Sequence, residues 1–342
     1  MPSLDSLIGD LSTVGDRDFE RTVLGSDVAT EIAGVIYDFV ARRLAPVENA
    51  IFYRTSVGLV AGLRIVDGRD VVVKVHRWQV SIARLTAVQL VQAHLAASGL
   101  PVPRPLCEPE PLGSGIAIIE EFRRGGAADG HDPLIRQSLA AGLLRFVKAA
   151  QPLGSIEDLG WPVLLRPPGS PLWPEPHDIR FDFQATREGA EWIDDLGRRA
   201  RRRLQSAAPG APVIGHVDWR VGNVGFEDRR ITAIYDWDSV AMAPEPFVVG
   251  AAAAQFCADW VRCGALASVG EMRSFVTEYE ETRGTPFGES ERDVIDATNL
   301  IYCAYLARCQ HSDVRLGVGP GRSASNGWIE LLRRREVESP IA

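Results

Sequence analysis

The sequence IGHVDWRVGNV, residues 214–224, is the stretch that decides the fold of this chain. It places four polar side chains, His216, Asp218, Arg220 and Asn223, in an otherwise apolar segment. Asp236, thirteen residues beyond Asn223, directly follows the β-rich run 231–235. Short β-rich runs separated by turn residues predict a hairpin. We therefore expect a hairpin that presents two acidic groups and an amide from its ends.

This set of groups is the one that phosphoryl transfer requires. A carboxylate orients and deprotonates the attacking hydroxyl, and hard oxygen ligands hold magnesium against the nucleotide phosphates. In kinases a lysine on a strand supplies further positive charge. Lys74 lies in the run Val71–Val75, where a charge is costly unless something pairs with it. It is also one of only two lysines among 37 basic residues, which indicates a position where arginine does not serve.

The order of these features is that of the kinase signature set: a strand lysine, then H-x-D-x-x-x-x-N, then a strand that ends in aspartate. The sequence resembles the aminoglycoside phosphotransferase and choline kinase-like family of small-molecule kinases. His216, Asp218 and Asn223 match the family's catalytic loop, and Asp236 with Trp237 matches its I-D-W metal motif. Further similarity lies at 67–74, 95–103 and 118–125, and the resemblance extends over about residues 48–250.

The resemblance implies a bilobal, protein-kinase-like α+β fold with the active site in the cleft between the lobes. The first lobe would be residues 1–123, a small antiparallel β-sheet that carries Lys74 and ends in a hinge near Phe122. The second, residues 124–342, would be mainly helical and would contain the catalytic loop 214–224 and the metal motif 236–238. Hydrophobic periodicity agrees with this division. It predicts strands over 51–53, 59–65, 71–75 and 116–119 and helices over 27–44, 81–97, 134–150, 189–207, 249–263, 270–282, 290–310 and 326–335.

The resemblance also implies roles for the residues of the two motifs. Asp218 would be the catalytic base, and Asn223 and Asp236 would hold Mg²⁺. His216 would support the backbone of the loop. Asp238 would either contact a second magnesium or cap the turn, and capping is the interpretation that we favour.

The remaining predicted site residues would bind ATP or GTP. Lys74 would contact the α and β phosphates, and the turn with Ser56 and Gly58 would cover the phosphates. The backbone from Glu120 to Phe122 would face the adenine. Arg220 would stabilise charge on the transferring phosphoryl group.

The sequence departs from the family pattern at three places. The aspartate that usually follows the metal motif is missing, and only Glu245 lies nearby. Val217 replaces the usual glycine before the aspartate, and the helix 81–97 contains no acid to pair with Lys74. Either Gln89 or Gln92 hydrogen-bonds the lysine, or its partner comes from elsewhere. The predicted function is ATP-dependent transfer of the γ-phosphoryl group to a hydroxyl of a small molecule. The alternative is a nucleotide-binding, kinase-like protein that is catalytically weak or inactive.

The sequence leaves the identity of the small-molecule substrate open. The net charge of −8 mildly favours a cationic substrate through electrostatic steering. Trp161 and Trp173, in a Pro- and Gly-rich stretch, belong either to a substrate lid or to a packed loop. Candidate substrate contacts on the C-terminal helices are Asp259, Trp260, Glu271, Tyr302 and Arg308.

Composition excludes several other classes of protein. With 46% hydrophobic and 24% charged residues the chain is globular, and its acidic balance argues against a nucleic-acid partner. The N-terminus has no secretory signal pattern and no apolar run is long enough to cross a membrane, so we expect a cytoplasmic protein without a membrane partner. The five cysteines form no CxxC pair and suit core packing. Nothing in the sequence indicates an oligomeric state.

Overall fold

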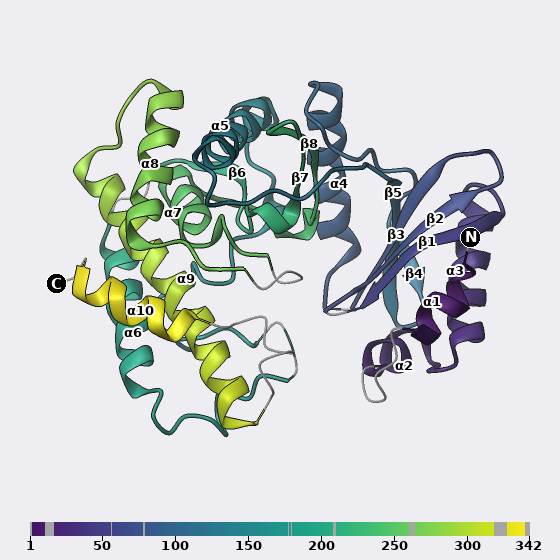
Figure 1. Cartoon of the computed structure of the whole chain (residues 1–342), viewed down its shortest axis with the longest axis horizontal. Helices are drawn as coiled ribbons and strands as arrows, with labels where there is room; N and C mark the ends of the chain where they lie inside the picture. Colours follow the sequence, from purple (N-terminus) through teal and green to yellow (C-terminus); the bar gives the residue numbers. More distant parts are fainter. Residues whose placement is uncertain are drawn as a thin grey trace. The chain divides into compact units, whose positions relative to one another are not determined.

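The chain divides into two compact units, residues 1–123 and 124–342, called here the N-terminal and the C-terminal unit. The structure is a computed structural model. It describes residues 2–10, 17–55, 57–77, 79–176, 178, 180–207, 210–259, 264–317 and 327–338. Figure 1 shows the secondary-structure elements of each unit.

The N-terminal unit is built on a five-stranded antiparallel sheet with the order β1-β2-β3-β5-β4. The predicted meander of three strands is confirmed. Gly68, with φ of 88°, provides the left-handed residue of the turn between β2 and β3. The strands are β1 (Val47–Thr55), β2 (Leu59–Ile65), β3 (Asp70–His76), β4 (Glu110–Leu112) and β5 (Gly115–Glu121).

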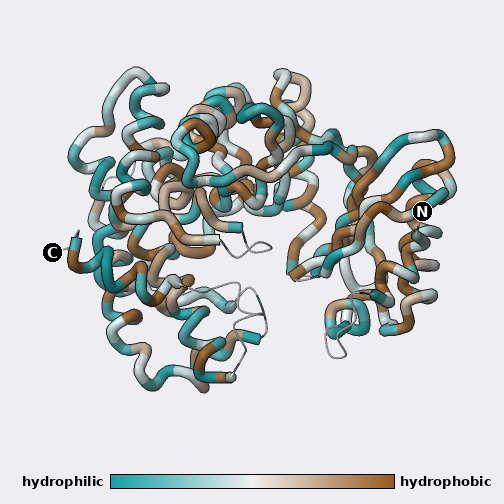
Figure 2. The backbone as a smooth tube through the Cα atoms, in the orientation of Figure 1, coloured by the Kyte–Doolittle hydropathy of each residue, from teal (hydrophilic) through white to brown (hydrophobic). Residues whose placement is uncertain are grey.

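The two faces of this sheet carry different side chains because residues alternate along each strand. One face, with Ala61, Val73 and Ile119, packs against α1 (Leu4–Asp10), α2 (Asp18–Leu24) and α3 (Ala29–Arg43) in a single buried cluster. The opposite face packs Ile116 and Ile118 against Leu85 of α4 (Ile82–Ala97). Figure 1 shows α4 on the side of the sheet away from α1 to α3, and Figure 2 shows many hydrophobic residues along the strands and α3.

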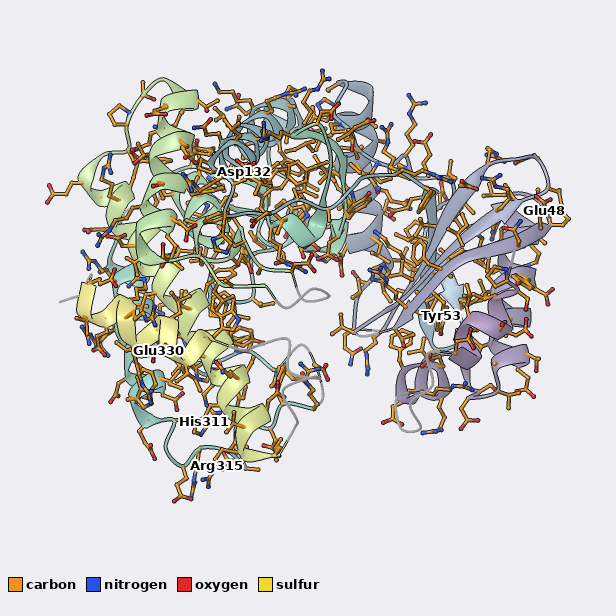
Figure 3. The ribbon with its side chains drawn as sticks, viewed as in Figure 1. Glu48, Tyr53, Asp132, His311, Arg315 and Glu330 are labelled. Carbon is orange, nitrogen blue, oxygen red and sulfur yellow. The ribbon has the colours of Figure 1, made fainter. Side chains whose placement is uncertain are left out.

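Two short helices and one strand of this unit were not predicted from the sequence. They are α1, α2 and β4, each too short for its periodicity to be recognised. The helix α2 is tied to the sheet by a buried hydrogen bond, because the Tyr53 hydroxyl donates to Glu20 over 2.8 Å. Figure 3 labels Tyr53 on its strand.

The C-terminal unit combines six α-helices, among the residues that the structure describes, with two short β-ribbons. The helices are α5 (Pro133–Ala150), α6 (Glu191–Ser206), α7 (Glu245–Gln255), α8 (Val269–Arg283), α9 (Glu289–Arg315) and α10 (Trp328–Glu338). One ribbon pairs β6 (Pro212–His216) with β9 (Val240–Pro244), and the other pairs β7 (Val224–Glu227) with β8 (Arg230–Ile234). The helix α5 packs against both ribbons (Figure 1).

Most of the predicted helices of this unit are confirmed, and one differs. The helix expected over 249–263 begins earlier, at Glu245, and α7 ends at Gln255, while residues 260–263 lie outside the described residues. The strand β9 was not predicted. It forms because it pairs with β6, a partner distant in sequence. In the part of the chain that the structure describes, no helix has the length and apolar character that crossing a membrane requires.

Candidate active site

The two predicted motifs lie side by side in the C-terminal unit. The loop after β6 carries Asp218 and ends in a 3-10 turn, Val221–Asn223, and the loop after β8 carries Asp236. Two backbone hydrogen bonds join these loops: Tyr235 N–H donates to Asn223 O over 2.8 Å, and Val217 N–H donates to Ser239 O over 3.1 Å. The spacing of the motifs therefore brings together the residues that the sequence analysis selected.

Buried aromatic rings hold both loops in place. Trp219 donates from its indole nitrogen to Leu139 O over 3.0 Å, and Trp237 donates to Ile234 O over 2.9 Å. Both tryptophans are fully buried, and the ring of Phe146 from α5 lies 6.1 Å and 5.8 Å from theirs. Because each tryptophan directly follows a site aspartate in sequence, packing of the rings orients the polar residues.

His216 holds the backbone of the loop, as the sequence analysis expected. Its Nε2 lies 2.9 Å from Tyr235 O, and its Nδ1 lies 3.3 Å from Asp218 N. The ring is completely buried, and burial lowers its pKa. A neutral ring with its proton on Nε2 satisfies both contacts, since Nε2–H donates to the carbonyl and Nδ1 accepts from the backbone N–H.

One amide group connects the two carboxylates. The Asn223 Nδ2 group lies 2.7 Å from Asp218 Oδ2 and 3.2 Å from Asp236 Oδ2. It also donates to the backbone carbonyl of Asp218 over 2.9 Å. Ser239, which the sequence analysis did not select, donates to Asp236 Oδ2 over 3.1 Å. The proposed base and the proposed metal-binding carboxylate thus share a neighbour.

Arg220 contacts the proposed base directly. Its Nε lies 3.0 Å and 3.1 Å from the two carboxylate oxygens of Asp218. Gly222 provides the space for this guanidinium, because a Cβ at that position would lie 2.3 Å from Arg220 Nη1. The positive charge that we expected to act on the phosphoryl group therefore also orients the carboxylate of Asp218.

The backbone and the charge of Asp236 are both unusual. Asp236 has φ of 61° and ψ of 53°, a left-handed conformation that costs a non-glycine residue on the order of 1 kcal/mol or more. Burial raises the pKa of its carboxyl, and the nearby carboxylate of Asp238 raises it further. A bound cation would stabilise the charged carboxylate of Asp236 and so oppose both causes of the raised pKa. Asp238 thus lies close enough to Asp236 to influence its charge.

The oxygen donors present here suit Mg²⁺. The Asp236 carboxylate and the side-chain oxygen of Asn223 are hard ligands of the kind that magnesium prefers. Among the described residues no group of three or more His, Cys, Asp or Glu side chains could hold a metal ion. A magnesium ion at this place would take its other ligands from nucleotide phosphates and water, as is usual for this ion.

The N-terminal unit places Lys74 beside a glutamate of the neighbouring strand. Lys74 Nζ lies 2.7 Å from Glu120 Oε1, and Gln92 Nε2 of α4 donates to Glu120 Oε2 over 2.9 Å. Gln89 instead donates to the backbone carbonyl of Cys107 over 2.9 Å. The partner of Lys74 therefore comes from β5, whereas we had expected Glu120 to contribute only its backbone.

Two phenylalanines lie on the same unit. Phe52, which the sequence analysis did not select, stands opposite Gly62 in the strand register, and a Cβ on that glycine would lie 2.3 Å from the phenyl ring. The ring centroid of Phe52 lies 6.0 Å from that of Phe122.

Gly58, of the turn predicted to cover the phosphates, lies close to β3: a Cβ added to it would lie 3.2 Å from Val75 O. Ser56 lies outside the described residues.

Two of the candidate substrate residues have structural partners instead. Arg308 is 1% exposed and donates to Thr186 Oγ1 over 3.1 Å and to Phe183 O over 2.5 Å. Glu271 accepts hydrogen bonds from Ser268 at the start of α8 and lies 2.7 Å from His131 Nδ1. Both side chains are therefore occupied by contacts that hold the C-terminal unit together.

Tyr302 lies within electrostatic range of the proposed base. Burial raises the pKa of its hydroxyl, and the negative charge of Asp218 raises it further.

Trp173 packs on Gly197 and donates to Asp194 over 2.8 Å, whereas Trp161 is 56% exposed. Trp173 thus belongs to a packed loop. Trp260 lies outside the described residues.

The site has the features of a kinase-like phosphotransferase. They are a strand lysine paired with a glutamate, and an H-x-D-x-x-x-x-N loop beside an aspartate that follows a strand. The model of the phosphotransferase enzyme family matches residues 62–261, more than half of the chain. The chain belongs to this family, and the predicted enzyme class, a small-molecule phosphotransferase, is confirmed. No curated protein matches the sequence.

Solved structures show the same fold at low sequence identity. An amicoumacin kinase in complex with AMP-PNP, Ca²⁺ and Ami is 13% identical, with a TM-score of 0.64 over 92% of this chain and 97% of the other. A macrolide 2′-phosphotransferase from Brachybacterium faecium is 17% identical, with a TM-score of 0.51 over 86% and 97%. The aminoglycoside phosphotransferase APH(4)-Ia, in a thermostable mutant with ADP and hygromycin B, is 14% identical, with a TM-score of 0.53 over 87% and 98%. The predicted bilobal, kinase-like α+β fold is confirmed.

Proposed function

We propose that this enzyme transfers the γ-phosphoryl group of ATP or GTP to a hydroxyl group of a small molecule. Asp218 accepts the proton of the attacking hydroxyl, and Arg220 orients the Asp218 carboxylate and stabilises charge on the transferring group. Lys74 binds the α and β phosphates. The turn at Ser56 and Gly58 covers the phosphates. The relatives crystallised with nucleotide, amicoumacin or hygromycin B support this class of reaction.

The observation that carries the proposal is the amide of Asn223, which contacts Asp218 and Asp236 at once. Phosphoryl transfer needs a base for the hydroxyl close to the ligands of the metal that binds the phosphates. A protein that only binds nucleotide has no use for a carboxylate held beside that site by both an amide and a guanidinium. This arrangement favours an active enzyme.

Asn223 and Asp236 would hold the Mg²⁺ ion. When bound, the ion neutralises charge on the phosphate oxygens and fixes their position. The chain itself contributes the strained backbone at Asp236, which aims the carboxylate, and the hydrogen bond from Ser239, which fixes one of its oxygens. The hydrogen bonds from Ser239 and from Asn223 both reach the Oδ2 atom of Asp236.

The alternative of an inactive relative rests on the missing acid in the helix 81–97 and on Val217 in the catalytic loop. Glu120 supplies an acid for Lys74 from the sheet, so the absence of an acid from α4 does not leave the lysine without a carboxylate. Val217 has no left-handed backbone that would demand glycine, since its φ is not among the positive values of the described residues. The structure thus accommodates these two departures from the family pattern.

A thermal-shift titration tests nucleotide binding. Wild type and Asp236→Asn are heated with ATP or GTP, each with and without Mg²⁺. A nucleotide at a hundred times its Kd adds roughly 2.7 kcal/mol of stability, which raises Tm by a few degrees in a chain of this length. We expect a magnesium-dependent shift in wild type that Asp236→Asn loses. No shift with either nucleotide would contradict the proposal.

The scarcity of lysine allows a second test of the same site. An acyl phosphate derivative of ATP acylates a nearby amine: the amine attacks the acyl carbon, the acyl–phosphate bond breaks, and ATP leaves. Lys148 is exposed on α5 and serves as the internal reference for Lys74. We expect mass spectrometry to find labelling of Lys74 that excess ATP suppresses, and equal labelling of Lys148 with and without ATP.

A further inference from the structure

We propose that Glu120 is the positioning residue for Lys74, so that the charge partner of the phosphate-binding lysine is built into the β-sheet and does not depend on the helix α4. This inference rests on the proposed function, because it assigns to Lys74 the phosphates of a nucleotide. It concerns residues of the N-terminal unit alone. It identifies a side chain that the sequence analysis had considered only for its backbone.

The strand register brings the two side chains together. In the antiparallel pair of β3 and β5, Lys74 stands opposite Ile118 and Val72 stands opposite Glu120. Residues two apart in a strand point to the same face, so Lys74 and Glu120 are diagonal neighbours on one face of the sheet. Long side chains reach across such a diagonal, and the observed distance of 2.7 Å is that of a charge-assisted hydrogen bond.

Burial strengthens the attraction between the charges of Lys74 and Glu120. The side chains of Lys74 and Glu120 are 13% and 3% exposed, so water screens their charges weakly. The other carboxylate oxygen of Glu120 accepts from Gln92, whose side chain is also buried. Each oxygen of Glu120 therefore has its own donor, an ammonium on one side and an amide on the other. This division holds the carboxylate in one orientation and, through it, the lysine.

The contributions of the sheet and of the helix are unequal. Lys74 and Glu120 are held in register by the backbone hydrogen bonds of two adjacent strands, and their contact needs no residue of α4. Gln92 adds a neutral hydrogen bond, which is worth less than one between charged groups. A shift of α4 would break the bond from Gln92 and leave the Lys74 to Glu120 bond in place. The lysine is accordingly set for phosphate binding whenever the sheet is folded.

The test compares variants of the full-length protein by calorimetric measurement of Kd for Mg-ATP and for adenosine, which lacks the phosphates. Glu120→Gln keeps the shape of the side chain and removes its charge. We expect it to weaken ATP binding by about tenfold or more, the effect of losing a hydrogen bond between charged groups. Adenosine binding should stay within about twofold of wild type, because adenosine makes no contact with Lys74. A merely structural role of Glu120 would weaken both ligands alike.

A double-mutant cycle shows whether Glu120 acts through the lysine. In the Lys74→Ala background, Glu120→Gln should cause little further loss of ATP affinity, because the two residues act as one unit. Gln92→Leu, which removes only the contribution of α4, should weaken ATP binding clearly less than Glu120→Gln does. Glu48→Gln, on the exposed part of β1 in the same sheet (Figure 3), is the matched control and should bind both ligands like wild type.

The outcomes separate this inference from the proposed function. If wild type binds neither Mg-ATP nor Mg-GTP, the proposed function is wrong and the inference falls with it. If wild type binds and Glu120→Gln binds ATP equally well, only the inference is wrong. It is also wrong if Gln92→Leu costs as much affinity as Glu120→Gln, or if the losses from Lys74→Ala and Glu120→Gln are additive. Far-ultraviolet circular dichroism and Tm of each variant establish that the variants compared are folded.

Discussion

Replacement of Gly222 by alanine should disable the catalytic loop without replacing any proposed catalytic residue. The added Cβ would lie 2.3 Å from Arg220 Nη1, well inside the 3.0 Å below which a neighbour must shift. The guanidinium has little freedom to shift, because its Nε already lies 3.0 Å and 3.1 Å from the two oxygens of Asp218. Any movement away from Gly222 lengthens or misaligns these bonds.

The expected size of the effect follows from the bonds that are lost. A hydrogen bond between charged groups contributes about 1.5–3 kcal/mol, which corresponds to roughly a 10- to 100-fold loss in rate if it orients the base in the transition state. Phosphoryl transfer to a hydroxyl-bearing substrate, coupled to detection of ADP, measures kcat and KM. We expect Gly222→Ala to lower kcat by this factor and to leave KM for the nucleotide nearly unchanged.

Two further variants make the reasoning refutable. In Gly270→Ala, at the first turn of α8, the new Cβ meets nothing closer than 3.9 Å, and this control should keep the wild-type kcat. Arg220→Ala should lower kcat, and the Gly222→Ala/Arg220→Ala double variant should be no worse than Arg220→Ala alone, since both changes act on one contact. A Gly222→Ala enzyme with normal kcat, or a double variant with additive losses, would refute the link from Gly222 through Arg220 to Asp218.

The remaining predictions concern the base, the buried arginine and one histidine. Asp218→Asn should lower phosphoryl transfer by about a hundredfold or more, as expected for loss of a general base, while Mg-ATP still raises Tm. Arg308→Ala should cost about 1–3 kcal/mol of unfolding free energy in urea, because it leaves the Thr186 hydroxyl and the Phe183 carbonyl without their donor. Burial lowers the pKa of His131, but its hydrogen bonds with Glu271 and with the carbonyl of Ala265, together with the negative charges of Glu271 and Asp129, raise the pKa overall. The stability from this pair is therefore fully present below the ordinary histidine pKa and is lost as pH rises through the raised one. His131→Gln should flatten the fall in Tm over that interval, by less than about 1 kcal/mol for so exposed a pair.

The elements that the sequence predicted well are those with long regular hydrophobic patterns or with clear capping and turn residues at their ends. The helix 81–97 was recognised because its apolar residues recur at helical spacing, and Ser81 caps it by accepting from Arg84 N–H over 3.1 Å. The three-stranded meander was recognised from β-branched runs and the turn at Gly68. The helices α1 and α2 and the strand β4 carry too few residues for such a pattern, and β9 depends on pairing with a strand far away in the chain.

Some site residues could likewise be predicted from sequence patterns, and others could not. The catalytic loop and the metal motif were found because their residues lie close together in sequence and the chemistry fixes their order. Ser239 was missed because no spacing links it to those motifs. It becomes visible only through its hydrogen bond to Asp236. Arg308 was one candidate for a substrate contact, and the structure shows that it is buried, which the sequence of a helix does not reveal for a charged side chain.

The sequence by itself determined the family, the α+β fold and the order of the polar residues, because turns, strand alternation and motif spacing are local properties of the chain. Only the tertiary structure decided the partner of Lys74. Strand pairing brings Glu120 next to it, and a helix distant in the chain adds Gln92. Tertiary structure likewise decided why residue 222 is a glycine, since the guanidinium of Arg220 takes the space that a side chain would need. Contacts of this kind follow from how the elements pack, and packing places side chains together irrespective of their separation in the sequence.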